Sequence, residues 1–193
     1  TILQIIKDGT IGDLRSMRVA FGFPPFLDSN NIRYSAKLGG GALLDAGAYA
    51  MKIAPFFLGN DIFVAQASLA QDQIKGVDIW GGGVVQQRDG PLFCHFSYGF
   101  DHYYQCSLEL WGNIGKLTTN RIFTAPVGYN PKLIVETQNV VEERSLSADD
   151  QFKNMLEHFY SLITGSESVI MEYEQNVQQA SLIHEFKQLT ERY

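Results

Sequence analysis

The sequence has 193 residues, of which 45% are hydrophobic and 19% charged, and its formal net charge is -6. This composition is typical of a globular protein with a substantial core and excludes a disordered chain. The acidic balance, without any cluster of Lys and Arg, argues against a nucleic-acid partner, because binding phosphates requires a basic surface. No apolar run is long enough to span a membrane and no signal peptide is visible, so we expect a cytoplasmic protein that does not bind membranes.

The first residues predict the end of a helix, followed by a strand. Residues 1–7 are typical of the last turns of a helix, which Gly9 would stop. Polar and apolar residues alternate over residues 14–23, as in a half-buried strand, and two prolines end it at positions 24–25. A polar loop follows over residues 26–37. Because the sequence opens on the end of a helix, we expect that a further segment precedes it.

A turn of three glycines at positions 39–41 opens the next helix. This helix is predicted from residue 42 to about residue 57, with a kink or an early end at Pro55. Asp45 and Tyr49 lie four residues apart, so on an α-helix they would share one face. Most of the neighbouring residues are small or apolar. A carboxylate and a phenol in an otherwise buried helix therefore mark a candidate site.

The pattern from residue 61 to about residue 138 is typical of strands separated by turns. The predicted strands are residues 62–71, 77–87, 92–100, 103–111, 116–119 and 132–137. Their short connections favour antiparallel neighbours, and residues 88–91, Arg-Asp-Gly-Pro, give the clearest hairpin signal. The two cysteines, Cys94 and Cys106, lie in apolar runs and are predicted to be buried free thiols, with a cross-strand disulfide as the alternative.

The last segment predicts two helices. Residues 147–150 form a near capping box, and the helix that follows would stop at Gly165. Its apolar residues at helical spacing are Phe152, Met155, Leu156, Phe159, Leu162 and Ile163. A final helix is predicted over residues 172–192, with an apolar side made of Tyr173, Val177, Ala180, Ile183 and Phe186.

Together these elements predict a single α+β domain over residues 1–193, with an open, mostly antiparallel β-sheet and helices packed on one face. The other face is expected to carry, in part, the aromatic residues Trp80, Phe93, Tyr98, Tyr103 and Tyr104. Such an uncovered face would be an unusually large apolar patch. We therefore expect a homo-oligomer that forms through this open face.

The pair Asp45 and Tyr49 has two interpretations from spacing alone. In the structural one, Asp45 binds loop backbone and Tyr49 is a core residue with a satisfied hydroxyl. In the functional one, Tyr49 gives a proton to a carbonyl oxygen or takes one from an alcohol, and Asp45 orients the reacting groups. Lys52 follows one turn later, and we expect it to reach solvent rather than the phenol.

Three further features each have a structural and a functional interpretation. The glycines at positions 39–41 could cradle an anion at the helix start, or simply allow a tight turn. Arg33, followed by Tyr34, suits a phosphate or carboxylate group, or is an ordinary surface arginine. The glycines at positions 81–83 lie inside a strand pattern, which indicates a bulge or close packing rather than a ligand loop.

Other chemistries lack the residue patterns that they need. None of the four histidines pairs with Cys, Asp or another His at the spacing of metal ligands, so we expect no metal site. No serine lies in a Gly-x-Ser-x-Gly setting, which argues against acyl transfer. Neither a Walker loop nor the Gly-x-Gly-x-x-Gly dinucleotide fingerprint occurs in the sequence.

Five segments together resemble one protein family. Asn31-Ile-Arg-Tyr34 and Leu38-Gly-Gly-Gly-Ala-Leu-Leu-Asp-Ala-Gly-Ala-Tyr49 resemble the C-terminal domain of the Gfo/Idh/MocA oxidoreductases. Residues 8–12, 112–115 and 150–159 are similar to the entry to the family's first sheet strand, its late glycine pair and its closing helix. The family includes glucose-fructose oxidoreductase, inositol dehydrogenase, dihydrodiol dehydrogenase and nucleotide-sugar ketoreductases.

The resemblance implies a two-domain protein. An N-terminal Rossmann domain binds NAD or NADP, and an α+β domain of the glyceraldehyde-3-phosphate dehydrogenase-like C-terminal type shapes the substrate site and forms the dimer. Residues 1–193 resemble only the second domain, so the Rossmann domain and the family's lysine in a Glu-Lys-Pro motif are expected to lie outside this chain. We therefore expect residues 1–193 to be inactive alone.

The resemblance also implies roles for four residues. Many members have histidine where this sequence has Tyr49, and tyrosine is typical of the glucose-fructose oxidoreductase, dihydrodiol dehydrogenase and sugar-ketoreductase branches. Tyr49 would exchange a proton with the reacting oxygen while hydride moves to or from the nicotinamide. Asp45 would help to bind substrate. Arg33 and Tyr34 would contact the substrate, including the phosphate of a nucleotide sugar.

The predicted function is thus the substrate-binding half of an NAD(P)-dependent oxidoreductase that acts on a sugar, nucleotide sugar or polyol. A non-catalytic sugar-binding or dimerisation module of the same fold is the alternative, and a dihydrodiol-type dehydrogenase is another. The choice between NAD and NADP depends on residues near the ribose, which the dinucleotide-binding half would supply.

Overall fold

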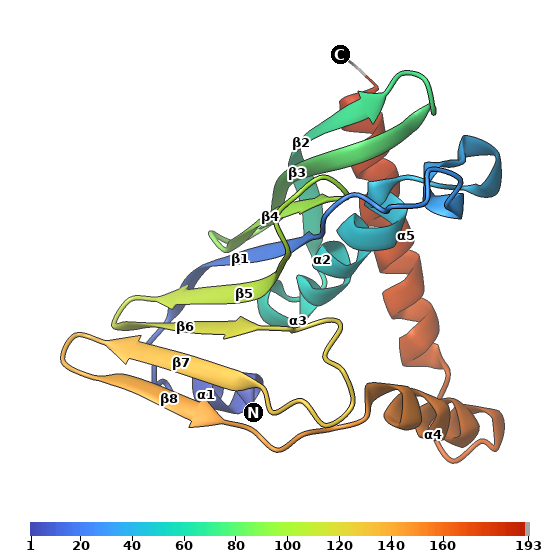
Figure 1. Cartoon of the computed structure of the whole chain (residues 1–193). Coiled ribbons are helices and arrows are strands. Elements are labelled where there is room, and N and C mark those ends of the chain that lie inside the picture. The colour runs from blue at the N-terminus through green and yellow to red at the C-terminus, as the bar shows by residue number, and fades with distance from the viewer. Residues whose placement is uncertain (192–193) are drawn as a thin grey trace.

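The computed structural model describes residues 1–191 and shows one open, mixed β-sheet of eight strands (Figure 1). The strand order is β2-β3-β4-β1-β5-β6-β7-β8. The strands are β1 (Leu14–Gly22), β2 (Ile62–Asp72), β3 (Val77–Gln87), β4 (Phe93–Gly99), β5 (Gln105–Gly112), β6 (Gly115–Asn120), β7 (Lys132–Thr137) and β8 (Val141–Ser145). Every predicted strand is present, and the predicted mostly antiparallel sheet is confirmed.

The first strand lies in the middle of the sheet. β1 pairs in parallel with β4 on one side and antiparallel with β5 on the other. All other neighbouring strands are antiparallel, including β3 and β4, which the predicted hairpin at residues 88–91 joins. Because β1 is central, its residues Met17, Val19 and Phe21 are buried in the core.

The edge strand β8 was not predicted. Its sequence, Val-Glu-Glu-Arg-Ser, is mostly charged, and four of its five residues are exposed. Charged side chains are typical of sheet edges, where they hinder pairing with another chain, so the strand lacks the apolar alternation by which strands are recognised. Lys132 on β7 contacts Glu143 on β8 at 2.7 Å, which adds to the backbone pairing.

The helices other than α4 gather on one face of the sheet, as predicted (Figure 1). The helices of the chain are α1 (Ile2–Lys7), α2 (Ala48–Ile53), α3 (Pro55–Leu58), α4 (Gln151–Ile163) and α5 (Ile170–Thr190), and a π-helical turn, Leu43–Gly47, runs directly into α2. α5 packs on β2 and α2, and its Leu182 and Phe186 are buried. The predicted end of this helix at residue 192 lies outside the described residues.

The open face of the sheet is more polar than predicted. Alternation along β4 places Phe96 and Tyr98 on the covered face, where Tyr98 is 1% exposed, and places His95 on the open face. The expectation that Tyr98 lies on the open face is therefore wrong. Tyr103 is exposed but precedes β5, whereas Trp80 lies within β3 and is partly exposed.

Both cysteines, Cys94 and Cys106, are buried and free, which confirms the prediction. Burial raises the pKa of the Cys94 thiol to about 12, so this thiol is protonated and unreactive at neutral pH. Among residues 1–191, no helix is both long and apolar enough to cross a membrane.

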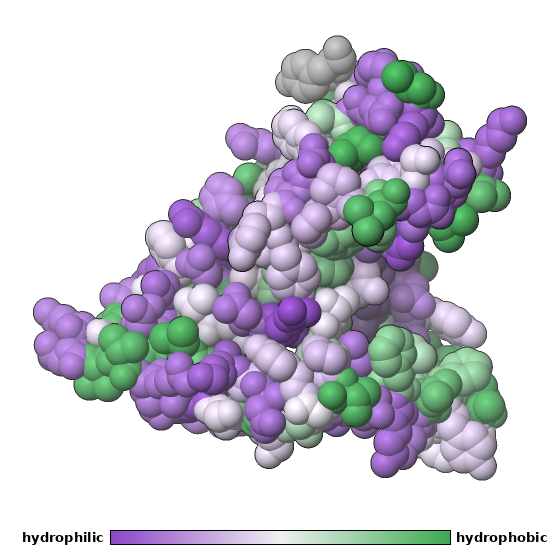
Figure 2. Space-filling model, in the orientation of Figure 1, coloured by the Kyte–Doolittle hydropathy of each residue, from purple (hydrophilic) through white to green (hydrophobic). Residues whose placement is uncertain are grey.

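Helix α4 stands apart from the sheet at one end of the molecule (Figure 1). Asp150 caps it by accepting hydrogen bonds from the backbone N–H groups of Phe152 and Lys153. Its apolar stripe is exposed, and the green surface over α4 in Figure 2 belongs to it. Together with the first half of α5, the stripe consists of Phe152, Met155, Leu156, Phe159, Tyr160, Ile163, Ile170, Met171, Tyr173 and Val177.

We expect His158 to make the junction of α4 and α5 sensitive to pH. Its ring nitrogens lie 3.0 Å from Glu167 and 3.1 Å from Glu172. The hydrogen bond to Glu172 and the charge of Glu167 raise the pKa of His158 above its usual value of 6.5. A raised pKa in the folded state means that the contact stabilises fully below pH 6.5 and is lost as the pH rises through the folded-state pKa.

An NMR titration of the His158 ring measures this effect. Glu172→Gln should lower the pKa of His158 more than Glu167→Gln does, because the bond to Glu172 is the larger cause. His158→Gln should remove the pH dependence of stability that the contact causes. A pKa of 6.5 or lower in the wild type would contradict the assignment.

Candidate functional site

The helix that carries the candidate residues begins with a π-helical turn. The turn spans Leu43–Gly47, and the Ala48 N–H donates a hydrogen bond to the Leu43 carbonyl, five residues back. Such wide turns are rare in proteins, and many of those that occur lie at functional sites. Asp45 lies within the turn and Tyr49 in the first turn of α2, so the two side chains do not follow the simple α-helical alignment that their spacing predicts.

Asp45 is held by Arg33 from the preceding loop. Arg33 Nε lies 2.7 Å from Asp45 Oδ2, and the two side chains are 37% and 32% exposed. The guanidinium group also lies over the ring of Phe26, 4.9 Å from its centroid. Arg33 is therefore not an ordinary surface arginine, because its charge is paired with that of Asp45. Its contact with a phosphate or carboxylate group of a ligand stays a prediction. A guanidinium group has five N–H donors, so several stay available to a ligand.

Tyr34 stabilises the same loop, which precedes the glycine turn, through its contacts. Its hydroxyl accepts a hydrogen bond from the Phe26 N–H at 3.1 Å, and its ring meets Phe26 and Phe100 edge to face. Lys75 from the β2–β3 turn places its Nζ 3.6 Å from the ring centroid. Tyr34 is therefore a packed residue whose contacts hold the loop beside the helix, and its contact with substrate stays a prediction.

Tyr49 is the most accessible of the four candidates, with 45% of its surface exposed. Its ring packs against Phe21 at 5.2 Å and Phe123 at 5.4 Å between centroids. The aromatic walls fix the ring while the hydroxyl end of the side chain is open to solvent or a ligand. Tyr49 is therefore not the core residue of the structural interpretation, and its role in proton transfer stays a prediction.

The turn of glycines at positions 39–41 is a tight turn rather than an anion cradle. The N–H groups of Gly39, Gly40 and Gly41 donate to the carbonyls of Ala36, Ser35 and Arg33. The Leu43 N–H donates to Asp78 Oδ2 at 2.6 Å. These donors are already used within the chain, so they are not available to a phosphate.

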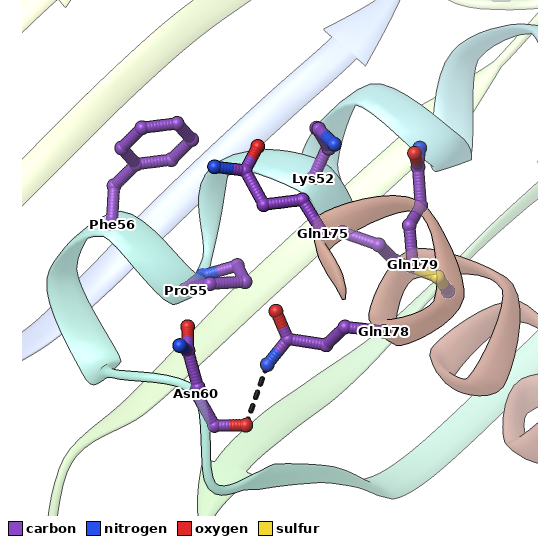
Figure 3. Close-up of a pocket in the computed structure, with 8 residues that line it drawn as sticks. Lys52, Pro55, Phe56, Asn60, Gln175, Gln178 and Gln179 are labelled. Carbon is purple, nitrogen blue, oxygen red and sulfur yellow. Dashed lines mark hydrogen bonds between the residues drawn. The ribbon is translucent and has the colours of Figure 1, made fainter. Parts of the chain in front are cut away.

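A small pocket of about 80 Å³ lies between α3 and α5 (Figure 3). Amide side chains from α5 face Lys52 and Pro55, and Gln178 Nε2 donates to the Asn60 carbonyl at 2.5 Å. Lys52 also bonds to Asn176 on α5, so it does not simply extend into solvent as predicted. Neither Tyr49 nor Asp45 lines this pocket, and we do not assign the reaction to it.

Sequence reasoning missed three residues of the site. Asp78 interrupts the apolar residues of β3, but in the sequence it is indistinguishable from any polar position of an alternating strand. Phe21 reads as an ordinary strand residue, and Phe123 lies in a loop without periodicity. Their roles follow from contacts between segments that are distant in sequence, which no local pattern shows. No group of His, Cys, Asp or Glu among residues 1–191 is arranged to hold a metal ion.

Residues 1–118 match the family model described as GFO/IDH/MocA C-terminal domain. A dTDP-3,4-didehydro-2,6-dideoxy-alpha-D-glucose 3-reductase from Saccharopolyspora spinosa is 39% identical over 158 residues, which are 82% of this chain and 47% of that protein. A reductase of the same name from Actinomadura kijaniata is 34% identical over 182 residues, which are 94% of this chain and 54% of that protein. The chain spans about half the length of these curated relatives.

The fold is also similar to solved structures. KijD10, a 3-ketoreductase from Actinomadura kijaniata, in complex with NADP and TDP-benzene, matches with a TM-score of 0.91 and 32% identity. The match covers 98% of this chain and 57% of KijD10. An aldose-aldose oxidoreductase from Caulobacter crescentus matches over 98% of this chain and 57% of its own, with a TM-score of 0.80 and 16% identity, which shows likeness of fold alone.

A double-mutant cycle tests the ion pair that fixes Asp45. Arg33→Ala and Asp45→Ala should each lower the free energy of unfolding, and the coupling between them should be about 0.5 to 1 kcal/mol, because the pair is partly exposed. Urea unfolding of the 193-residue chain measures all four stabilities. The pair Glu142 and Arg144 on the edge strand β8 serves as a control, with a smaller coupling expected. Strict additivity at Arg33 and Asp45 would show that the pair does not stabilise the fold.

Proposed function

Because the chain belongs to the Gfo/Idh/MocA family, we propose that it is the substrate-binding half of an NADP-dependent reductase that acts on a keto sugar linked to a nucleotide. The family model and the fold match support the class, and the names of the relatives support the substrate. The observation that carries the proposal is Tyr49, whose accessible phenol has packed walls and a free hydroxyl.

Tyr49 is proposed to supply the proton of the reduction. A phenol is a hydrogen-bond donor at neutral pH, so its Oη can bind the carbonyl oxygen of the sugar. NADPH, when bound, supplies the hydride for the carbonyl carbon. As the carbon–oxygen double bond becomes a single bond, the proton moves from Tyr49 Oη to the oxygen, which leaves a hydroxyl group on the sugar. Phe21 and Phe123 hold the ring during this transfer.

Arg33 and Asp45 are proposed to act together at the substrate. Asp45 accepts the Nε–H of Arg33 and orients the guanidinium plane. The remaining N–H groups of Arg33 can then bind a phosphate oxygen, which is the bidentate chemistry that arginine favours. Tyr34 keeps the loop in place by accepting the Phe26 N–H, and this half-buried side chain is proposed to contact the nucleotide.

A second domain is proposed to hold the cofactor. The residues of this chain do not fit the pyrophosphate of a dinucleotide, because the glycine turn has used its N–H groups internally and the chain has no Gly-x-Gly-x-x-Gly fingerprint. About half of each curated relative lies outside the match. We propose that a dinucleotide-binding domain supplies this part and packs against the exposed apolar stripe on α4 and α5.

The open face of the sheet is proposed to join copies of the protein. Arg18 on β1 lies 4.2 Å from the centroid of the Trp111 ring, and Trp111 Nε1 donates to Glu109 at 3.0 Å. These contacts order a mixed polar and aromatic surface, which within residues 1–191 lies on the face of the sheet opposite the buried Met17 and Val19. Tyr, Trp and Arg are enriched at subunit interfaces, which is consistent with an oligomer through this face.

Replacing the phenol tests the chemistry. In the protein that joins this chain to its dinucleotide-binding domain, Tyr49→Phe should lower kcat by about 100-fold to 10,000-fold, because general-acid catalysis is lost, and should leave KM for the sugar nearly unchanged. Oxidation of NADPH with a keto-sugar nucleotide measures both constants. Tyr129→Phe, in the loop between β6 and β7, is the matched control and should keep full activity. Full turnover of Tyr49→Phe would favour the alternative of a non-catalytic sugar-binding module.

Two surface substitutions test the assembly. Trp111→Glu on the open face should yield monomers in sedimentation velocity, since it places a charge in the proposed subunit interface. Phe159→Glu on α4 should leave the oligomer size unchanged but raise the Kd for NADP, because it loosens the cofactor domain. If Phe159→Glu produces monomers and Trp111→Glu does not, the two surfaces have been assigned the wrong way round.

A further inference from the structure

A half-buried carboxylate lies beneath the start of the helix that carries Tyr49. Asp78 is the second residue of β3, and its Oδ2 accepts the Leu43 N–H at 2.6 Å. Leu43 is the first residue of the π-helical turn, so this hydrogen bond joins the turn directly to the sheet. Burial raises the pKa of Asp78 above its usual range, against the backbone N–H groups of Leu43 and Ala42, which lower it. The site therefore keeps a carboxylate where its burial is unfavourable.

The residue before the helix is shaped to fit this carboxylate. Gly41 has a φ of +116°, which only glycine adopts without strain. A Cβ at Gly41 would overlap Asp78 Oδ1. The third glycine of the turn is thus required both by its backbone angle and by the carboxylate below it. The motif that opens the helix and Asp78, which lies 37 positions later in the sequence, form one structural unit.

Tyr98 supports the other end of the same turn. A Cβ at Gly47, the last residue of the turn, would lie only 3.0 Å from Tyr98 Cδ1, so the backbone rests on the ring. The Tyr98 hydroxyl points at Gly81, where a Cβ would lie 2.5 Å from it. This hydroxyl is buried and has no hydrogen-bond partner among residues 1–191. The glycines at positions 47 and 81 therefore form the slot in which Tyr98 lies.

We propose that Asp78 is a positioning residue for the reaction, because it fixes the first residue of the π-helical turn while Tyr98 fixes the last. Asp45 lies in the middle of the turn and Tyr49 two residues beyond it. The contacts of the turn with Asp78 and Tyr98 therefore set the direction of both side chains. This inference rests on the proposed function of Tyr49. Asp78 itself touches neither substrate nor cofactor and acts only through the backbone.

The reaction is sensitive to such positioning. A displacement of about 1 Å at the reacting atoms costs up to about 100-fold in rate. A carboxylate that merely capped the helix would contribute stability, and replacing it would leave kcat unchanged wherever the protein is folded. A positioning carboxylate gives a different result, because its loss lowers kcat in the folded protein while the KM for the sugar changes little.

The test compares Asp78 with a carboxylate of the same backbone chemistry elsewhere. Glu185 on α5 accepts the Val64 N–H of β2 at 2.9 Å and serves as the matched control. The variants are Asp78→Ala, Asp78→Asn and Glu185→Ala in the protein that includes the dinucleotide-binding domain. The measurements are kcat and KM with a keto-sugar nucleotide, at a temperature where all variants are folded, and amide hydrogen exchange of residues 42–49.

Asp78→Ala should lower kcat about 10-fold to 100-fold and speed exchange in residues 42–49. Asp78→Asn keeps one acceptor for the Leu43 N–H, so it should recover most of the rate without loss of thermal stability. Glu185→Ala should change exchange only where α5 meets β2. The proposal is wrong if Asp78→Ala lowers kcat no more than Glu185→Ala does, or if exchange in residues 42–49 is unchanged.

The two proposals fail in different ways. If the wild-type protein reduces no keto-sugar nucleotide, the proposed function is wrong, and the exchange of residues 42–49 alone decides whether Asp78 holds the turn. If the wild type is active, and Asp78→Ala loses its hydrogen-exchange protection but keeps its kcat, the reductase function stands and the positioning role is overturned.

Discussion

The structure depends on the close packing of one helix, the π-helical turn followed by α2, against the centre of the sheet. The side chains that face the sheet along this helix are small and fully buried, namely Ala42, Ala46, Ala50 and Ala54. Because they end at Cβ, the helix backbone can lie directly on β1, β3 and β4, and the larger Tyr98 fills the remaining space. A bulkier residue at any alanine would lift the helix and with it Tyr49, since cores tolerate added volume poorly.

The charges around this helix are arranged so that each carboxylate is compensated. Asp45 pairs with Arg33 at the surface, and Asp78 accepts backbone N–H groups beneath the turn. An uncompensated negative charge beside Tyr49 would repel a phosphate-bearing ligand and would oppose loss of the phenol proton. The observed pairing avoids both effects. The free hydroxyl of Tyr49 and the remaining donors of Arg33 are then the polar groups that the proposed site offers to a substrate.

Local patterns were sufficient to predict the elements but not their neighbours. Half-buried strands show apolar alternation, which is why β1 to β7 could be located from the sequence. The charged edge strand β8 lacks that signal, and the insertion of β1 between β4 and β5 depends on long-range pairing. The same limit applies to the site. Asp45 and Tyr49 stood out in their helix, whereas the ion pair to Arg33, the bond to Asp78 and the π-helical turn depend on residues brought together by folding.

The surfaces that remain exposed differ in chemistry, and this difference suggests an order of assembly. The stripe on α4 and α5 is almost entirely apolar, whereas the open sheet face carries Arg18, His95 and Gln105 among its exposed side chains. Apolar interfaces are typical of permanent contacts, and mixed surfaces are typical of contacts between units that also exist apart. The proposed contact through α4 is therefore expected to form during folding. The proposed contact through the sheet is expected to form later, between copies that are already folded and in which the helix that carries Tyr49 is already packed on the sheet.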